Sequence, residues 1–208
     1  MNVTEVLSTQ DNHALLQALA VLQEGGTAAF PTDTVYGLGA LAFHPQAVDK
    51  LYTIKDRQTT KAIAVLIGRR QDVPKVAASF SPQAEKLAQA FWPGPLTIIV
   101  PRHPDLPDNL GPLPTLGIRI PNHPTAIELL SLTGPMAVTS ANISGEAETR
   151  TAGEVLAQLD GRIDLVIDGG ATPGGMPSTV VDVSGGAAQV LRQGPISSQE
   201  IEDVLGVD

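Results

Sequence analysis

The stretch Pro31-Thr32-Asp33-Thr34-Val35-Tyr36-Gly37-Leu38-Gly39 decides how the rest of the sequence is interpreted. It follows the apolar run 27–30, which predicts a buried strand, and it precedes His44-Pro45, which predicts a helix start. We therefore expect a strand-to-helix loop, a common ligand site in α/β proteins. Its hydroxyls, carboxylate and phenol can bind a ligand, and its glycines let backbone N–H groups approach one. The alternative is an ordinary turn marked by proline and glycine.

A cluster of basic residues follows between positions 50 and 75. It holds seven of the 13 lysines and arginines of a chain whose net charge is -9. The acidic residues within it are Asp56 and Asp72. Such a local positive field is expected to bind an anionic ligand such as a nucleotide, and the alternative is a solvated face. The basic residues are Lys50, Lys55, Arg57, Lys61, Arg69, Arg70 and Lys75.

The composition predicts a packed protein of the cytoplasm. Of the 208 residues, 42% are hydrophobic and 17% are charged, which is enough apolar material for a core. The absence of cysteine excludes disulfides, thiolate nucleophiles and zinc–thiolate sites. The longest clean apolar run, 62–67, is far shorter than a membrane span, and residues 1–5 lack the pattern of a signal peptide. The acidic pI near 4.8 argues against broad nucleic-acid binding.

Strands and helices are predicted to alternate along the chain. Apolar stripes, Pro starts and capping boxes predict helices over 12–24, from Pro45, from Ser81-Pro82, from Pro124, from Thr151 and from Ser197. Apolar β-branched runs predict strands at 27–30, 62–67, 96–100, 116–120, 136–139 and 165–167, and a hairpin of 179–183 with 188–191. The sequence therefore predicts a single α/β domain over 1–208, with a twisted mixed sheet, parallel and antiparallel, flanked by helices.

Polar loops follow several of these strands, at 31–39, 140–145 and 168–178. Loops at the strand ends of one sheet can converge on a crevice. Such a crevice would hold many donors and few acids, which suits phosphate and carboxylate groups. The long loop 101–115 is also expected to be functional. The crevice residues would be Thr32, Thr34, Thr139, Ser140, Ser178, Asn142, Lys55, Arg57, Lys61 and Arg119.

Other common site motifs are missing from the sequence. It has no phosphate loop of the Gly-x-x-x-x-Gly-Lys-Ser/Thr type and no His-Glu-x-x-His motif. The run 169–175 is rich in glycine but lacks the spacing of a dinucleotide loop. His44 and His123 each precede a proline at a predicted helix start, which favours capping or surface roles over catalysis.

Taken together, several motifs resemble those of YrdC-like domains, the threonylcarbamoyl-AMP synthases. They occur in that family's order and cover residues 27 to about 195. Each motif alone is weak, but the set is highly specific. The motifs are Pro31–Gly39, Lys55-x-Arg57, Trp92-Pro-Gly-Pro-Leu-Thr97, Gly117-Ile-Arg-Ile-Pro121, Thr139-Ser-Ala-Asn-Ile-Ser-Gly145, Pro177-Ser-Thr-Val-Val-Asp182 and Arg192-Gln-Gly194.

The resemblance implies an open α/β fold with a large concave, positively charged cavity, and a nucleotidyltransferase reaction. L-Threonine, bicarbonate or CO2, and ATP would give threonylcarbamoyl-AMP and pyrophosphate. The product would serve N6-threonylcarbamoyladenosine formation in tRNA, at the adenosine next to the anticodon. A partner transferase would carry out the tRNA step, and direct contact with tRNA would be weak. Mg2+ would arrive with ATP, with no metal held by the protein alone.

The resemblance also implies roles for individual residues. The threonine-binding positions would be Thr32, Thr34, Tyr36, Arg119, Thr139 and Ser178. Arg119 would hold the threonine carboxylate, because a guanidinium can bind it through two hydrogen bonds. Lys55 and Arg57 would act catalytically by neutralising phosphate charge. The ATP-binding positions would be Lys55, Arg57, Lys61, Thr115, Ser140, Asn142 and Arg192.

The chain departs from the family pattern after Lys61. The family usually has Pro-Leu there, whereas this chain has Ala62-Ile63, and Leu66 stands where some relatives have histidine. These departures leave room for a YrdC-like paralogue with another carbamoyl or adenylation substrate. A second alternative is an RNA-binding module, supported by the basic cluster but opposed by an acidic chain with seven aromatic residues.

Overall fold

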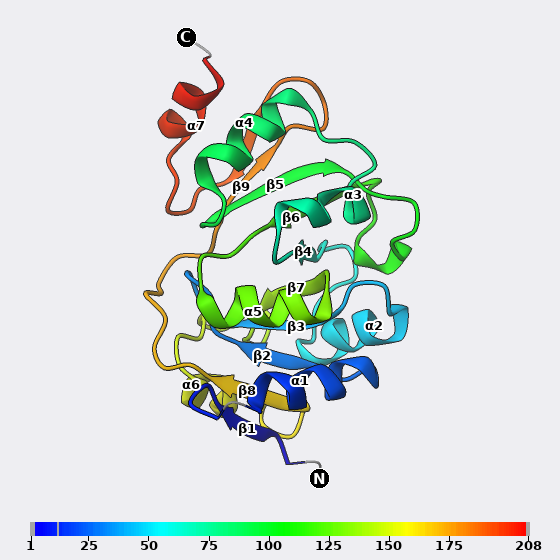
Figure 1. The fold of residues 1–208 in the computed structure, drawn as a ribbon, viewed down its shortest axis with the longest axis vertical. Helices are drawn as coiled ribbons and strands as arrows, with labels where there is room; N and C mark the ends of the chain where they lie inside the picture. Colours follow the sequence, from blue (N-terminus) through cyan, green and yellow to red (C-terminus); the bar gives the residue numbers. More distant parts are fainter. Residues whose placement is uncertain (1–2, 12, 207–208) are drawn as a thin grey trace.

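The computed structural model describes residues 3–11 and 13–206, and its ten strands form one mixed sheet (Figure 1). The strand order is β1-β8-β2-β3-β7-β4-β6-β5-β9-β10. The sheet contains parallel pairs, such as β4 with β6 and β5 with β9, and antiparallel pairs, such as β3 with β7 and β5 with β6, so the predicted mixed sheet is confirmed. The strands are β1 (Glu5–Ser8), β2 (Ala28–Phe30), β3 (Gly37–Leu41), β4 (Ala64–Leu66), β5 (Leu96–Pro101), β6 (Thr115–Arg119), β7 (Met136–Ser140), β8 (Leu165–Asp168), β9 (Thr179–Asp182) and β10 (Gln189–Arg192).

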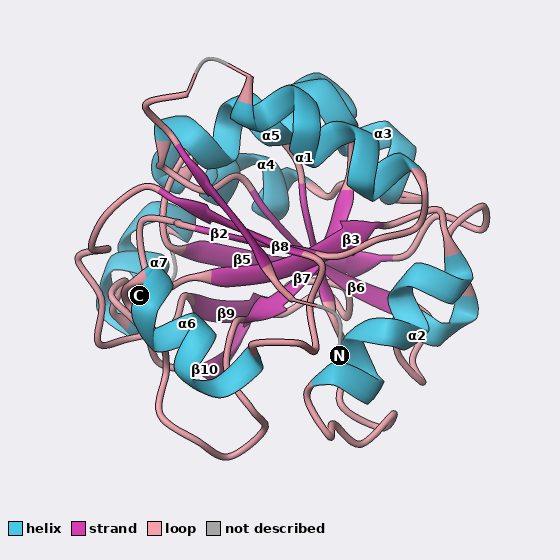
Figure 2. Cartoon of the chain, turned by 90° about the horizontal axis from the view of Figure 1, so that it is seen from below, coloured by secondary structure: helices cyan, strands magenta, loops and turns pink. Residues whose placement is uncertain are grey.

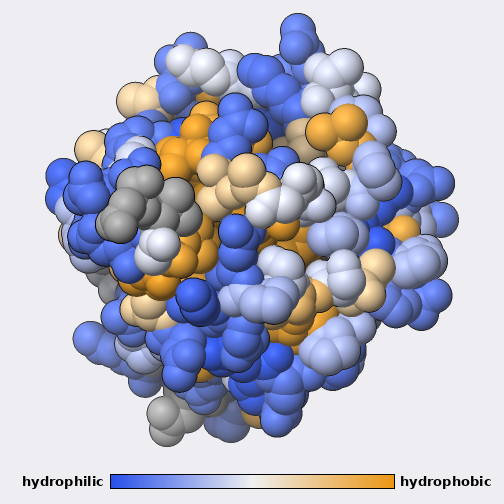
Figure 3. Space-filling view, turned by 90° about the horizontal axis from the view of Figure 1, so that it is seen from above, coloured by the Kyte–Doolittle hydropathy of each residue, from blue (hydrophilic) through white to orange (hydrophobic). Residues whose placement is uncertain are grey.

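Helices cover both faces of the sheet. Helices α1 and α5 pack in one apolar core, and α2, α3, α4, α6 and α7 pack in the other. Figure 2 looks along the twisted sheet, with α1 and α5 above its strands and α2 and α6 below them. Figure 3 shows the molecule from above. Hydrophilic side chains cover most of this face, and smaller hydrophobic areas lie between them. The helices are α1 (Ala14–Gln23), α2 (Pro45–Ile54), α3 (Val73–Val76), α4 (Pro82–Phe91), α5 (Pro124–Thr133), α6 (Ala152–Leu159) and α7 (Ser198–Leu205), with 3-10 turns η1 (Arg70–Asp72) and η2 (Asp108–Leu110).

The predicted helix starts are confirmed by their caps. Ser81 accepts a hydrogen bond from the Ala84 N–H, and Ser197 forms a complete capping box with Glu200. Pro45 and Pro124 occupy the first turns of α2 and α5, where a missing N–H costs nothing. Among the described helices, none is long and apolar enough to cross a membrane.

The stretch 31–39 was predicted to be a strand-to-helix loop, and this prediction is wrong. Its first six residues connect strand β2 to strand β3. Residues 37–41 form β3, which pairs antiparallel with β2 and with β7. The glycines of this run serve close packing. A Cβ on Gly37 would lie 2.9 Å from Val138 Cγ1, and one on Gly39 would lie 2.9 Å from Met136 Cε. The ligand-facing loop is therefore the shorter segment 31–36.

Candidate active site

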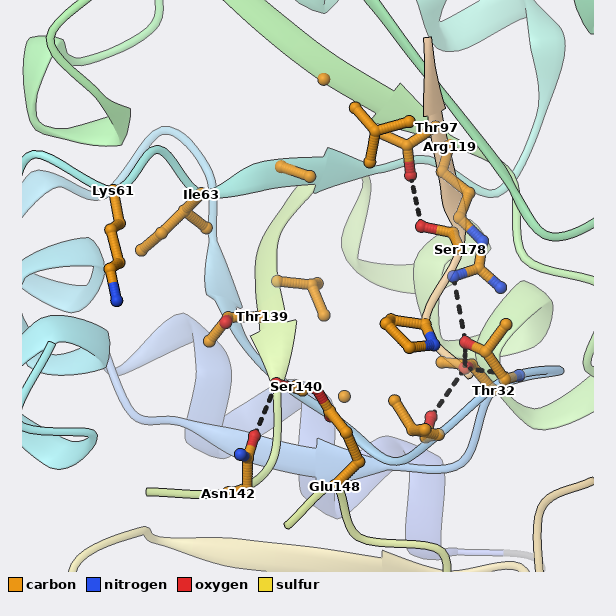
Figure 4. Close-up of a pocket in the computed structure, with 18 of the residues that line it drawn as sticks. Thr32, Lys61, Ile63, Thr97, Arg119, Thr139, Ser140, Asn142, Glu148 and Ser178 are labelled. Carbon is orange, nitrogen blue, oxygen red and sulfur yellow. Dashed lines mark hydrogen bonds between the residues drawn. The ribbon is translucent and has the colours of Figure 1, made fainter. Parts of the chain in front are cut away.

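A cavity of about 480 Å3 opens beside the central strands. This volume lies within the range of small-molecule sites, roughly 300–1,000 Å3. Its walls come from the loop 31–36, segment 55–64, loop 140–148 and strands β4, β5, β6, β7 and β9, and Figure 4 shows many of their side chains. Cationic side chains outnumber carboxylates, which favours anionic ligands. The cations are Lys55, Arg57, Lys61, Arg119 and Arg192, and the carboxylates are Glu146 and Glu148.

The loop 31–36 is held by its own hydroxyl groups. Thr32 Oγ1 donates to the Val35 carbonyl at 2.7 Å and accepts from the Thr34 N–H at 3.2 Å. The Thr32 and Thr34 hydroxyl oxygens lie 3.0 Å apart. Both side chains line the cavity and are buried, so the loop presents its hydroxyls from a fixed backbone.

Tyr36 fixes the end of this loop. Its ring is fully buried, and its hydroxyl donates to the Gly170 carbonyl at 2.8 Å. Burial raises the pKa of the phenol, so the group stays a donor at neutral pH. Tyr36 therefore joins the loop 31–36 to the glycine-rich loop after β8. From the predicted site loop 168–178, only Pro177 and Ser178 line the cavity.

Arg119 lies at the end of β6 with its guanidinium already engaged. Nε donates to the Gly94 carbonyl at 3.0 Å, and Nη1 donates to Thr34 Oγ1 at 3.1 Å. Nη2 forms an ion pair with Asp33. Burial lowers the pKa of Arg119, and the neighbouring Asp33 opposes this shift. A ligand carboxylate that reaches this site therefore meets a guanidinium that is already paired with Asp33 and hydrogen-bonded to Thr34.

Ser178 belongs to a second hydroxyl cluster on the wall formed by β5 and β9. Its Oγ lies 2.8 Å from Thr97 Oγ1, and Arg192 Nη2 donates to it at 3.2 Å. Arg192 Nε also donates to the Ser178 carbonyl at 3.0 Å. The edge strand β10 thus delivers a cation to the same place as the hydroxyls of the two neighbouring strands.

Lys55 follows the last residue of α2, and only 1% of it is exposed. Its Nζ donates to the backbone carbonyls of Ser140 and Asn142 and, at 3.1 Å, to Asn142 Oδ1. An ammonium group has three N–H bonds, so these oxygens use its full donor capacity. This geometry makes Lys55 a positioning residue for loop 140–142 and does not support the predicted direct contact with phosphate.

Arg57 and Lys61 keep donors for a ligand. Arg57 Nε and Nη2 donate to the carbonyls of Lys61 and Ala62 at 3.3 and 2.9 Å. Arg57 Nη1 and Lys61 Nζ make no hydrogen bond to any residue that the structure describes. Figure 4 shows Lys61 on the opposite side of the cavity from Arg119. The cavity therefore has two cationic ends.

A left-handed turn sets the directions of Lys55 and Arg57. Asp56 between them has φ 51°, a conformation that a residue with a Cβ seldom adopts. Its carboxylate pairs with Arg162 Nη1 at 2.9 Å, and the same nitrogen donates to the Ile54 carbonyl at 3.1 Å. Arg162 thus fixes the turn that sends Lys55 into the protein and Arg57 into the cavity.

Loop 140–146 forms the floor of the cavity near Lys55. Ser140 Oγ donates to Asn142 Oδ1 at 2.5 Å, and Asn142 Nδ2 donates to the Glu146 carbonyl at 2.8 Å. Both side chains line the cavity. The predicted ATP-binding positions Ser140 and Asn142 are therefore part of one network centred on the Lys55 ammonium group.

The structure brings every predicted site residue to this cavity except Thr115. Thr115 pairs with Pro101 at the start of β6, outside the lining. Sequence reasoning missed Glu148, whose place depends on the path of loop 143–149.

The three departures from the family pattern lie at the site. Ala62, Ile63 and Leu66 all line the cavity and form part of its apolar wall.

The basic cluster at 50–75 does not form one surface. Lys50 Nζ donates to the Gly25 carbonyl at 2.7 Å. Arg69 and Lys75 both pair with the buried Asp72, and Arg70 pairs with Glu85. The remaining three, Lys55, Arg57 and Lys61, line the cavity. The structure therefore gives little support to the RNA-binding alternative.

Comparison with known proteins gives consistent matches over most of the chain. The family model Sua5/YciO/YrdC, described as telomere recombination, matches residues 20–194. A putative threonylcarbamoyl-AMP synthase of Mycobacterium tuberculosis is 40% identical over 200 residues, which cover 96% of this chain and 92% of the relative. The threonylcarbamoyl-AMP synthase of Bacillus subtilis is also 40% identical, but the alignment covers only 60% of that longer protein.

Solved structures also match the chain over nearly its whole length. The Pyrococcus abyssi Sua5 structure complexed with L-threonine has a TM-score of 0.93 and 35% identity, and the match covers 99% of this chain and 61% of that one. The Escherichia coli YciO structure has a TM-score of 0.85 and 25% identity, covering 97% and 100% of the two chains. This chain thus spans about three fifths of the longer relatives and nearly all of the shorter ones.

Proposed function

The chain belongs to the Sua5/YciO/YrdC family, and on that basis we propose that it is a threonylcarbamoyl-AMP synthase. It would join L-threonine, bicarbonate or CO2, and ATP to give threonylcarbamoyl-AMP and pyrophosphate. This makes it a nucleotidyltransferase. The observation that carries the proposal is a single cavity with a hydroxyl-rich cationic end at Thr34 and Arg119 and a second cationic end at Arg57 and Lys61.

The end at Arg119 suits an amino acid. Its guanidinium would bind the α-carboxylate, since Arg binds carboxylates through parallel N–H bonds. Thr32, Thr34 and Ser178 provide hydroxyls around it, and Thr139 lies on the same lining. The solved relative complexed with L-threonine supports threonine as the amino-acid ligand.

The opposite end suits a triphosphate. Arg57 and Lys61 would contact phosphate oxygens through their remaining donors. Arg192, which donates to Ser178 on the neighbouring wall, would add positive charge from there. Ser140 and Asn142 would position the nucleotide from the floor of the cavity. Thr115 lies outside the lining of the cavity, and its contact with ATP stays a prediction.

The chemistry needs no covalent enzyme intermediate. The threonine amine adds to CO2 and loses a proton, which gives a carbamate. A carbamate oxygen then attacks the α-phosphorus of ATP, and the bond to the bridging oxygen of pyrophosphate breaks. MgATP is the nucleotide substrate. Arg57 and Lys61 stabilise the charge that grows on the leaving pyrophosphate, so catalysis rests on positioning and electrostatic stabilisation.

The product is a mixed anhydride, which must be passed to an acceptor before water destroys it. We propose that a tRNA threonylcarbamoyl transferase receives it and modifies the adenosine next to the anticodon. A cytoplasmic location for this chain follows from the same proposal.

The test is pyrophosphate release from ATP and Mg2+, measured with and without L-threonine and with and without bicarbonate. We expect release only when both are present, together with a threonylcarbamoyl-AMP peak by mass spectrometry. Release that needs neither, or no release despite ATP binding, would overturn the assignment.

A paralogue with another amino-acid substrate is the second candidate. It is favoured by one observation: the three departures from the family pattern, Ala62, Ile63 and Leu66, all line the cavity. The same assay with serine, valine and other amino acids in place of threonine separates the two candidates.

A further inference from the structure

One carboxylate in the cavity has a buried oxygen with no partner. Glu148 Oε2 is buried, and no described residue donates a hydrogen bond to it. Leaving a buried acceptor unpaired costs about 1–3 kcal/mol, and more for a charged group. A ligand that supplies the missing donor would remove that cost.

The backbone around Glu148 is fixed. The Thr149 carbonyl accepts from the Tyr36 N–H at 2.9 Å, and Thr149 Oγ1 donates to the Ala141 carbonyl at 3.0 Å. On the other side, Gln158 Nε2 donates to the Ala147 carbonyl at 3.0 Å. In Figure 4 the Glu148 side chain lies on the Ser140 and Asn142 side of the cavity, across from Thr97 and Ser178. Its position is therefore set by the fold.

The charge of Glu148 faces cations that it does not contact. It opposes the fall in pKa that burial causes at Lys55 and at Arg192. No ion pair joins it to any cation that the structure describes. The Lys55 ammonium is fully used by protein oxygens, and Arg192 donates to Ser178. The missing partner is therefore expected to come from a ligand.

The proposed substrates bring several hydrogen-bond donors: the ammonium and hydroxyl groups of threonine, the ribose hydroxyls and the adenine amino group. Only the ammonium group carries a positive charge, which matches an unpaired carboxylate. We propose that Glu148 accepts hydrogen bonds from the amino group of the amino-acid substrate, and so selects amino acids over other carboxylic acids. This inference rests on the proposed function. A magnesium ion is the competing partner, but among the described residues no group of three His, Cys, Asp or Glu side chains is placed to hold a metal.

The test compares two ligands that differ only in the amino group: L-threonine and 3-hydroxybutanoate, titrated into the full chain by calorimetry at pH 7. Glu148→Gln keeps the size of the side chain and removes its charge. We expect threonine to bind this variant roughly tenfold to a hundredfold more weakly, the range for a hydrogen bond to a charged group. Binding of 3-hydroxybutanoate should not weaken. Glu128→Gln, the same change at an exposed position on α5, should leave both affinities unchanged.

Each other outcome overturns the inference in a recognisable way. Equal losses for both ligands would show a structural role, and no loss for either would show that Glu148 is not used. If Glu148→Gln leaves threonine binding intact but abolishes the effect of Mg2+ on ATP binding, the partner of Glu148 is the metal. If the unmodified protein binds ATP but not threonine, the proposed function itself fails together with the inference.

Discussion

At the scale of single residues, the site divides its lysines and arginines between two tasks. The N–H groups of Lys55 and Arg119 donate mainly to protein oxygens. Arg57 and Lys61 each keep N–H groups that can donate to a ligand. The sequence motif Lys55-x-Arg57 presents both cations alike, but the turn at Asp56 sends them in different directions. Such a difference depends on backbone dihedrals and on Arg162, more than one hundred positions away, so sequence reasoning could not reach it.

Replacement of Arg57 tests the ligand-facing role. Arg57→Ala removes two hydrogen bonds to the backbone carbonyls of Lys61 and Ala62 and the donor that faces the cavity. We expect adenylate formation to fall by orders of magnitude, on the scale of roughly 10²–10³ for one lost electrostatic contact to the reacting group. Pyrophosphate release measures the effect, and circular dichroism checks the fold. Near-normal turnover would remove Arg57 from the mechanism.

Lys55 gives a prediction about pH. Burial lowers the pKa of its ammonium group from 10.5 to about 8. Between pH 8 and 10.5 the unfolded chain therefore binds more protons at this site than the folded one, so the contribution of Lys55 to the free energy of unfolding rises with pH. Urea unfolding at pH 7 and pH 10 should show the wild type gaining stability relative to Lys55→Met as pH rises. A constant difference between the two proteins would contradict the lowered pKa.

At the scale of helices and strands, the sequence predicted an element correctly where several local motifs for it occurred together. Ser81-Pro82 and Ser197 to Glu200 marked helix starts because capping is a local interaction. Strand β3 was missed because Gly37 and Gly39 resemble a turn, although their lack of a Cβ serves contact with Val138 and Met136. Strand β1 was missed because Leu7 is its single buried residue, which gives no alternating pattern.

Substitution within β3 tests this use of glycine. A Cβ at Gly39 would lie 2.9 Å from Met136 Cε, 3.1 Å from Val138 Cγ2 and 3.2 Å from Phe30 Cε1. We expect Gly39→Ala to destabilise the protein by about 1–3 kcal/mol, the usual cost of overpacking. Gly185→Ala is the matched control, because its Cβ would meet nothing within 4 Å. Urea midpoints measure both, and equal stability of the two variants would refute the packing argument.

At the scale of the whole molecule, the fold class was predictable and the strand order was not. Alternating apolar runs and capped helices predict an α/β domain with a mixed sheet. Nothing local predicts that β3 pairs with β7, or that β9 pairs with β5. These neighbours are far apart in sequence and are fixed by packing of the two sheet faces. The residues that the family motifs indicated, apart from Thr115, line one cavity.

The ion pair between Asp33 and Arg119 has a consequence for a protein working among metabolites. The Asp33 carboxylate competes with any ligand carboxylate for the Arg119 guanidinium. Because Asp33 is part of the same chain, it acts at an effective concentration of roughly millimolar or more. Free organic acids that offer a carboxylate and little else must displace it without further gain. We therefore expect a carboxylate to bind Arg119 only when its remaining atoms also find partners in the cavity, so that simple organic acids bind weakly.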